Sequence, residues 1–227
     1  MNLKMCAGIV LMISGAIIAF NGAMKASETM INLGICGIFI GAVLFSFSRQ
    51  RSFANLFKPY HETLKDLAGY LEIKRAIYIP RCEYLPEGGV FLAINEDFEL
   101  DLARLSYETP IVGGREKEAG LLFRNPGIEI IREAEELSFE AISSALRARN
   151  LIKSANLYEE EILRIFIESV AVNFCSEDCR LVACPICSSL LMAIAEESKE
   201  LLMVEEFKVG ERIEILARKI GGVEKWT

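Results

Sequence analysis

The sequence predicts an α+β domain with a mixed or antiparallel sheet, preceded by a transmembrane helical hairpin. Residues 5–24 and 30–47 form two apolar runs without a single charged side chain. Further along the chain, short β-prone runs alternate with helix-like segments. The last two of these runs, 201–208 and 212–220, are joined by a turn at 209–210, which is typical of an antiparallel pair. Interspersed strands and helices with such an end favour the α+β class.

The two apolar runs are long enough to cross a membrane. They contain twenty and eighteen residues, separated only by residues 25–29. A helix rises about 1.5 Å per residue, so each run can span a hydrocarbon core of about 30 Å. A cleaved signal peptide is the alternative for the first run, although that run is longer than usual and a second follows almost at once. Neither run contains an ionisable Asp, Glu, Lys, Arg or His, which argues against a channel or transporter.

Small residues recur in both runs. Gly34, Gly37 and Gly41 lie on nearby faces of the second run, and Gly37 to Gly41 is a GxxxG motif. Gly8 and Gly15 are seven residues apart in the first run. Small residues let helix backbones approach closely, so these glycines either pack the hairpin on itself or form a homodimer contact through Gly37 and Gly41.

The charge of the chain is unevenly distributed. Residues 1–51 carry four basic residues and one acidic residue, a net charge of +3. Because the whole chain has a net charge of −7, residues 52–227 carry −10. An acidic domain repels phosphate, so we expect no nucleic-acid partner. The expected division is a two-helix hairpin at 1–51, a juxtamembrane helix at 52–72 and a cytoplasmic α+β domain at 73–227.

Basic residues flank the hairpin on one side. Arg49, Arg51 and Lys58 follow the second run, and Lys4 precedes the first. The positive-inside rule then predicts a multi-pass protein of the cell membrane with both termini in the cytoplasm.

Residues 53–71 carry apolar side chains at three- and four-residue steps, which predicts a helix. Its first turns either lie among the lipid headgroups or belong to a stalk helix that packs on the domain. This segment holds His61, the only histidine, so the sequence gives little support for a histidine-based metal site or catalytic triad.

The first β-prone runs are 76–79 and 89–94, with turn residues between them. They predict a hairpin or meander with a long connection. We expect a mobile surface loop at 110–120 and a short strand at 120–127 that ends in a Pro-Gly turn.

The second half of the domain mixes helices and strands. Residues 128–151 are expected to be mostly helical, with Ser138 as a helix cap. The β-branched segment 161–174 favours a central strand, with a helix as the alternative. A helix at 185–198 follows.

Four cysteines crowd together before that last helix, in the pattern Cys175-x3-Cys179-x4-Cys184-x2-Cys187. Pro185 suits the first helical position, which places Cys184 at the N-cap and Cys187 in the first turn. Free backbone N–H groups and the positive end of the helix dipole favour thiolate over thiol there.

Three interpretations of the cysteines stay open. All four can hold Zn²⁺ or an iron–sulfur cluster, although the spacing matches neither a zinc ribbon nor a ferredoxin. Cys184 and Cys187 can act as a dithiol redox pair at a helix N-terminus. The thiols can also be buried packing residues or disulfides.

Several of these motifs together resemble a family of uncharacterised archaeal membrane-anchored proteins. The resemblance covers most of the chain and rests on the two N-terminal spans, the segment 120–127 ending in Asn-Pro-Gly, and the Cys-Pro-Ile-Cys-Ser-Ser-Leu run from Cys184 to Leu190 before a helix and a strand pair. It implies an archaeal source and an anchored α+β layout, and no activity. Cys175 and Cys179 lie outside the motifs that match.

The sequence therefore favours a membrane-anchored cytoplasmic binding or sensing module for an unknown small-molecule ligand. The sequence contains no catalytic motif and no phosphate loop that would argue for an enzyme. The alternatives are a tethered thiol or metal redox protein acting through Cys184 and Cys187, and a scaffold for another membrane protein. A ligand site requires a pocket, redox chemistry requires at least two solvent-reachable thiols, and a scaffold requires an exposed apolar patch.

Overall fold

The structure is a computed structural model of the 227-residue chain. It forms two compact units, Met1–Pro59 and Tyr60–Thr227. The predicted boundaries at 51/52 and 72/73 stay predictions. The residues that the structure describes are 3–48, 62–113, 116–132, 134, 136–169, 175, 177–182 and 184–227. The predicted helix at 53–71 lies partly outside them, and its described part is helical over 62–70.

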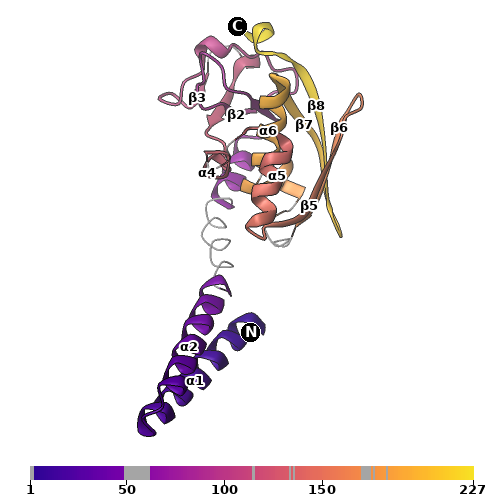
Figure 1. Cartoon of the computed structure of the whole chain (residues 1–227). Helices are drawn as coiled ribbons and strands as arrows, with labels where there is room; N and C mark the ends of the chain where they lie inside the picture. Colours follow the sequence, from indigo (N-terminus) through magenta and orange to yellow (C-terminus); the bar gives the residue numbers. More distant parts are fainter. Residues whose placement is uncertain are drawn as a thin grey trace. The chain divides into compact units, whose positions relative to one another are not determined.

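The first unit is a hairpin of α1 (Leu3–Met24) and α2 (Glu28–Ser48), which lie side by side (Figure 1). Glycines form the contact between the two backbones. A Cβ added to Gly15 would lie 2.7 Å from the Gly34 carbonyl oxygen, and one added to Gly41 would lie 2.8 Å from that of Gly8. These glycines therefore pack the hairpin on itself, and the homodimer contact through Gly37 and Gly41 stays a prediction.

The outside of the hairpin is apolar. Two stretches, 6–24 and 28–45, are long and apolar enough to cross a membrane, with mean hydropathies of 1.9 and 1.8. Only 17% and 11% of their residues are buried, whereas a core helix of a soluble protein is mostly buried. Large side chains such as Phe20 and Phe39, each 69% exposed, point away from the partner helix.

The second unit is built on an open sheet of eight strands. Their order is β3-β4-β2-β1-β7-β8-β6-β5, and every neighbouring pair is antiparallel. The α+β class with an antiparallel sheet after an apolar hairpin is therefore confirmed. The strands are β1 (Arg75–Ile79), β2 (Gly89–Ala93), β3 (Ile111–Val112), β4 (Gly120–Phe123), β5 (Ile152–Tyr158), β6 (Leu163–Ser169), β7 (Glu200–Val209) and β8 (Ile213–Gly222).

Three α-helices of the described domain follow the first four strands. They are α4 (Ile128–Arg132), α5 (Phe139–Ala148) and α6 (Pro185–Ser198). Ser138 caps α5 as predicted, because its hydroxyl accepts a 3.3 Å hydrogen bond from the Ala141 N–H. Short 3₁₀ segments complete the described elements: η1 (Leu102–Arg104), η2 (Glu116–Glu118), η4 (Glu177–Arg180) and η5 (Val223–Trp226).

The sheet has a separate apolar core on each face. Side chains alternate along β1, so Ala76 and Tyr78 enter one core while Ile77 and Ile79 enter the other. The first core contains the buried faces of α4, α5 and α6. Figure 1 shows α5 and α6 lying along the sheet. The second core lies under the irregular segment 94–107 and η5. We call these the helix face and the loop face.

Most strands that the sequence predicts are present. The runs 201–208 and 212–220 lie in β7 and β8, and those at 76–79 and 89–94 lie in β1 and β2. The described part of the segment 161–174 is a strand and not a helix, because β6 pairs with β8 on one side and with β5 on the other.

Two edge strands were not predicted. β5 intersperses Lys153, Ser154 and Asn156 with apolar residues, and a register shift interrupts their alternation, so the local pattern does not signal a strand. β3 lies in the segment expected to be a surface loop, and it has only two residues. Both strands form by pairing with a neighbour rather than from their own sequence.

Candidate metal centre

The four clustered cysteines meet at the start of α6. Cys179 lies in η4, and Cys184 is the N-cap of α6 with an extended backbone (φ −65°, ψ 161°). Pro185 occupies the first position and Cys187 the first turn, as the sequence predicts. Cys175 approaches from the segment after β6, of which residues 170–174 lie outside the described part of the chain.

The sulfur atoms are close to one another. Those of Cys175, Cys179 and Cys184 all lie within 4.8 Å of one another. Cys175 Sγ lies 3.2 Å from Cys184 Sγ and 3.8 Å from Cys187 Sγ. A tetrahedral ion with Zn–S bonds of about 2.3 Å separates its sulfur ligands by roughly 3.8 Å. None of the four sulfurs is joined in a disulfide. The trio is close enough to bind a metal, and Cys187 lies beside it.

The cluster is enclosed. Cys175 is 7% exposed, Cys184 is 2% exposed, and Cys179 and Cys187 are fully buried. All four belong to the core of the helix face. Solvent therefore has little access to any of the four sulfurs.

The thiols influence one another strongly. Hydrogen bonds with Cys175, Cys179 and Cys187 hold the pKa of the Cys184 thiol well below its usual value. Hydrogen bonds with the other three sulfurs raise the pKa of Cys175 instead. The cluster thus favours a thiolate at the helix N-cap with thiols around it, which is the state from which a metal displaces the remaining protons.

A buried polar network supports the cluster. Ser188, which follows Cys187, donates from its hydroxyl to Asn125 Oδ1 at 2.9 Å, and its carbonyl accepts from Asn125 Nδ2 at 3.0 Å. Asn125 Oδ1 also accepts from the Gly127 N–H at 2.6 Å. The network is fully buried at Ser188 and 2% exposed at Asn125, so it ties the first turn of α6 to the turn after β4.

Tyr78 of β1 joins the same site. Burial raises the pKa of its phenol strongly, a hydrogen bond with Ser188 opposes this, and charge on Cys187 and Cys184 raises it further. The tyrosine therefore stays protonated beside the cluster. Its hydroxyl is a neutral group that hydrogen-bonds with Ser188 beside the cysteines.

Gly127 permits the close approach of this turn. A Cβ at this position would lie 2.6 Å from the Pro185 carbonyl oxygen and 2.7 Å from Ser189 Cβ. Sequence reasoning did not identify Tyr78, Asn125 or Ser188 as parts of the site. The Asn-Pro-Gly turn was the one local signal, since Asn and Gly mark tight turns whose backbone another element can approach.

The chain matches no protein-family model, no curated protein and no solved structure. The resemblance to archaeal membrane-anchored proteins therefore stays a prediction.

Proposed function

We propose that this chain is a membrane-anchored binding or sensing module whose cysteine cluster holds one Zn²⁺ ion that stabilises the domain. The observation that carries the proposal is the mutual approach of the buried sulfurs of Cys175, Cys179 and Cys184 within 4.8 Å. Cys187, 3.8 Å from Cys175, supplies the fourth thiolate.

A single ion fits this space better than an iron–sulfur cluster. A cluster places several irons and inorganic sulfides between its thiolates, which spreads the cysteine sulfurs apart. Here the Cys175 and Cys184 sulfurs are 3.2 Å apart, which leaves room for one ion at the centre. Four protein ligands with no open position are the pattern of a structural zinc site rather than a catalytic one.

Burial counts against the redox alternative. Thiol–disulfide exchange requires that an attacking thiolate reach a disulfide of its substrate. Cys187 is fully buried and Cys184 is 2% exposed, so neither sulfur of this pair meets that requirement.

The apolar exterior of the hairpin supports the anchor. Its exposed large side chains would face water if the hairpin were soluble, at a cost of about 25 cal/mol per Å². Lipid removes that cost. The basic residues after the second span support the predicted orientation, with both termini in the cytoplasm, where thiols stay reduced and available to a metal.

Metal analysis of the full chain tests the metal centre. Purified in detergent under reducing, anaerobic conditions, it is expected to carry about one zinc per chain and no acid-labile sulfide. Cys184→Ser should lose the zinc, whereas Cys82→Ser, which removes a thiol away from the cluster, should keep it. A folded native chain without metal would contradict the proposal. Detection of iron together with acid-labile sulfide would show that the site holds an iron–sulfur cluster and not zinc.

Alkaline washing of membranes tests the anchor separately. The native chain should stay in the membrane pellet. Ile13→Lys, which places a charge at a position that is 56% exposed within α1, should reduce the retained fraction because a central Lys costs about 2.5–3.5 kcal/mol on insertion. Ser27→Lys puts the same charge in the turn and should have no effect. Release of the native chain from the pellet would contradict the anchor.

A further inference from the structure

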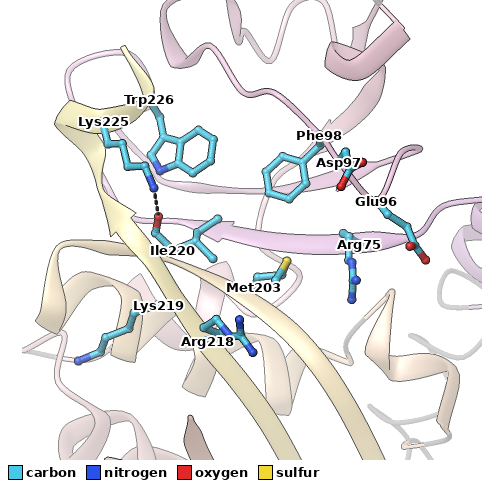
Figure 2. A pocket seen from close by; sticks show the side chains of 10 residues that line it. All are labelled: Arg75, Glu96, Asp97, Phe98, Met203, Arg218, Lys219, Ile220, Lys225 and Trp226. Carbon is cyan, nitrogen blue, oxygen red and sulfur yellow. Dashed lines mark hydrogen bonds between the residues drawn. The ribbon is translucent and has the colours of Figure 1, made fainter. Parts of the chain in front are cut away.

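A pocket lies on the loop face of the domain, on the opposite side of the sheet from the cysteines. It is an open depression of about 420 Å³ between β1, the segment after β2, β7, β8 and η5 (Figure 2). Small-molecule sites in proteins measure roughly 300–1,000 Å³, so its volume suits a small organic ligand.

Two buried nitrogens of this pocket lack a hydrogen-bond partner. They are Arg75 Nε and Trp226 Nε1, and both residues line the pocket. In the described part of the chain, the one other buried side-chain N or O atom without a hydrogen-bond partner is Glu87 Oε2, which forms an ion pair with Arg124 at 3.6 Å. A buried donor without a partner is destabilising, so these two nitrogens mark the pocket wall as a place where polar groups remain unsatisfied.

The charges around the pocket point to an anion. Its lining has four cationic side chains, Arg75, Arg218, Lys219 and Lys225, against the two carboxylates of Glu96 and Asp97. Arg218 and Lys219 are paired with glutamates outside the lining, which leaves Arg75 and Lys225 as the cations available to a ligand. Local positive charge of this kind attracts anionic ligands in an otherwise acidic protein.

Among these cations, Arg75 is the one best placed to bind. Arg218 already pairs with Glu205 at 2.9 Å, and Lys219 lies 3.7 Å from Glu159. Lys225 donates to the Ile220 carbonyl at 3.2 Å, as Figure 2 shows. The Nε–H of Arg75 has no such acceptor among the described residues, and a guanidinium matches carboxylate or phosphate oxygens in a bidentate geometry.

Two aromatic rings form one wall of the pocket. Phe98 and Trp226 stack with centroids 5.9 Å apart and planes 15° from parallel. A ligand ring between them would need roughly 7 Å, twice the normal carbon–carbon contact distance, so a ligand packs against this pair rather than inside it. Met203 and Ile220 add apolar surface nearby (Figure 2).

We infer that this pocket binds a small planar organic anion, an aromatic ring or base that carries a carboxylate or a phosphate. The anionic group binds Arg75, and the ring packs against the Phe98–Trp226 wall. This inference rests on the proposed function as a binding module, and it depends on neither the zinc nor the anchor.

The sole tryptophan of the chain reports on this pocket directly. Trp226 lines it, so tryptophan emission of the full chain in detergent monitors the site without a label. Titration with AMP and with nicotinate provides a phosphate and a carboxylate probe on planar rings. At least one probe should change the emission in a saturable manner, and the tighter one identifies the anionic group. Adenosine, which lacks the anion, should bind more weakly than AMP.

Variants of Arg75 separate binding from folding. Arg75→Gln should weaken binding about tenfold, as expected for loss of one charge-assisted hydrogen-bonding group. Arg75→Lys keeps the charge and should recover part of that loss. Arg147→Gln removes the same charge from exposed α5 and should bind like the native chain. No saturable change with either probe, or native affinity in Arg75→Gln, would overturn the inference.

Zinc content measured on the same preparations keeps the two proposals distinguishable. Binding by a metal-free chain would support the pocket and reject the zinc site. Failure of both probes with a zinc-loaded chain would reject the pocket alone.

Discussion

The two faces of one sheet differ in whether their buried polar groups have hydrogen-bond partners. On the helix face, Asn125 and Ser188 share two hydrogen bonds, and the four cysteines lie beside them in a closed cluster. On the loop face, Arg75 and Trp226 keep buried nitrogens without partners along an open pocket. Both faces have apolar cores, so the difference lies in polar satisfaction rather than in packing.

This contrast separates a site that stabilises the fold from one that recognises a ligand. A closed network has no remaining donor to offer, so changes to it should reduce stability. An open site holds unsatisfied donors until a ligand supplies acceptors, so changes to it should reduce binding and leave the fold intact or more stable.

Removal of the proposed zinc should have the largest effect, and it acts on the helix face. A chelator should lower the Tm of the full chain in detergent by roughly 10 °C or more, because structural zinc contributes many kcal/mol to folding. Circular dichroism measures the change. Cys82→Ser should respond to the chelator like the native chain. An unchanged Tm after chelation would remove the distinction between the two faces.

Asn125→Ala should be the next largest change. It removes three hydrogen bonds and leaves the buried Ser188 hydroxyl and Gly127 N–H without acceptors, which costs about 3 kcal/mol of stability. Thermal unfolding checks this value, with Asn156→Ala on the exposed side of β5 as the matched control. Equal stability of the two variants would show that the network does not support the fold.

Tyr107 gives a smaller, pH-dependent effect on the loop face. Its hydroxyl donates to the Gly88 carbonyl, and burial, with the Glu87 charge, raises its pKa to about 12. The folded-state pKa lies above the ordinary 10.0, so this contribution is fully present below pH 10 and is lost between pH 10 and about 12.

The comparison with Tyr107→Phe isolates that contribution. The native chain should lose about 1 kcal/mol more than the variant across this range, a value reduced by solvent screening of a partly exposed ring. Denaturant unfolding at the two ends of the range measures it. A constant difference between the two proteins would contradict the assigned pKa.

Arg75→Met should have the smallest effect on stability, and the sign should be reversed. It replaces the unpartnered Nε by apolar atoms and should stabilise the domain by up to about 1 kcal/mol while weakening the binding of AMP or nicotinate about tenfold or more. Thermal unfolding and tryptophan emission measure the two outcomes on one sample. A marked loss of stability would mean that Arg75 supports the fold, and the two faces would then be alike.

Local signals in the sequence determined the pieces of this protein. The two uncharged runs predict the hairpin because helix length and apolarity need no distant partner. Pro185 after Cys184 predicts the start of α6, a β-branched run predicts β6, and two runs joined by a turn predict β7 and β8. The clustering of the cysteines in sequence also predicted a joint site, since a few residues of chain cannot carry them far apart.

Tertiary structure alone decided how those pieces combine. The interrupted alternation of β5 does not identify it as a strand by itself, and it forms because β6 offers it a partner. Tyr78 and Asn125 reach the cysteines only because antiparallel pairing brings β1 and the turn after β4 beneath α6. Arg75 and Trp226 share a pocket although they lie at opposite ends of the domain's sequence. Local periodicity carries no information about such pairings, because they depend on which faces of distant elements bury each other.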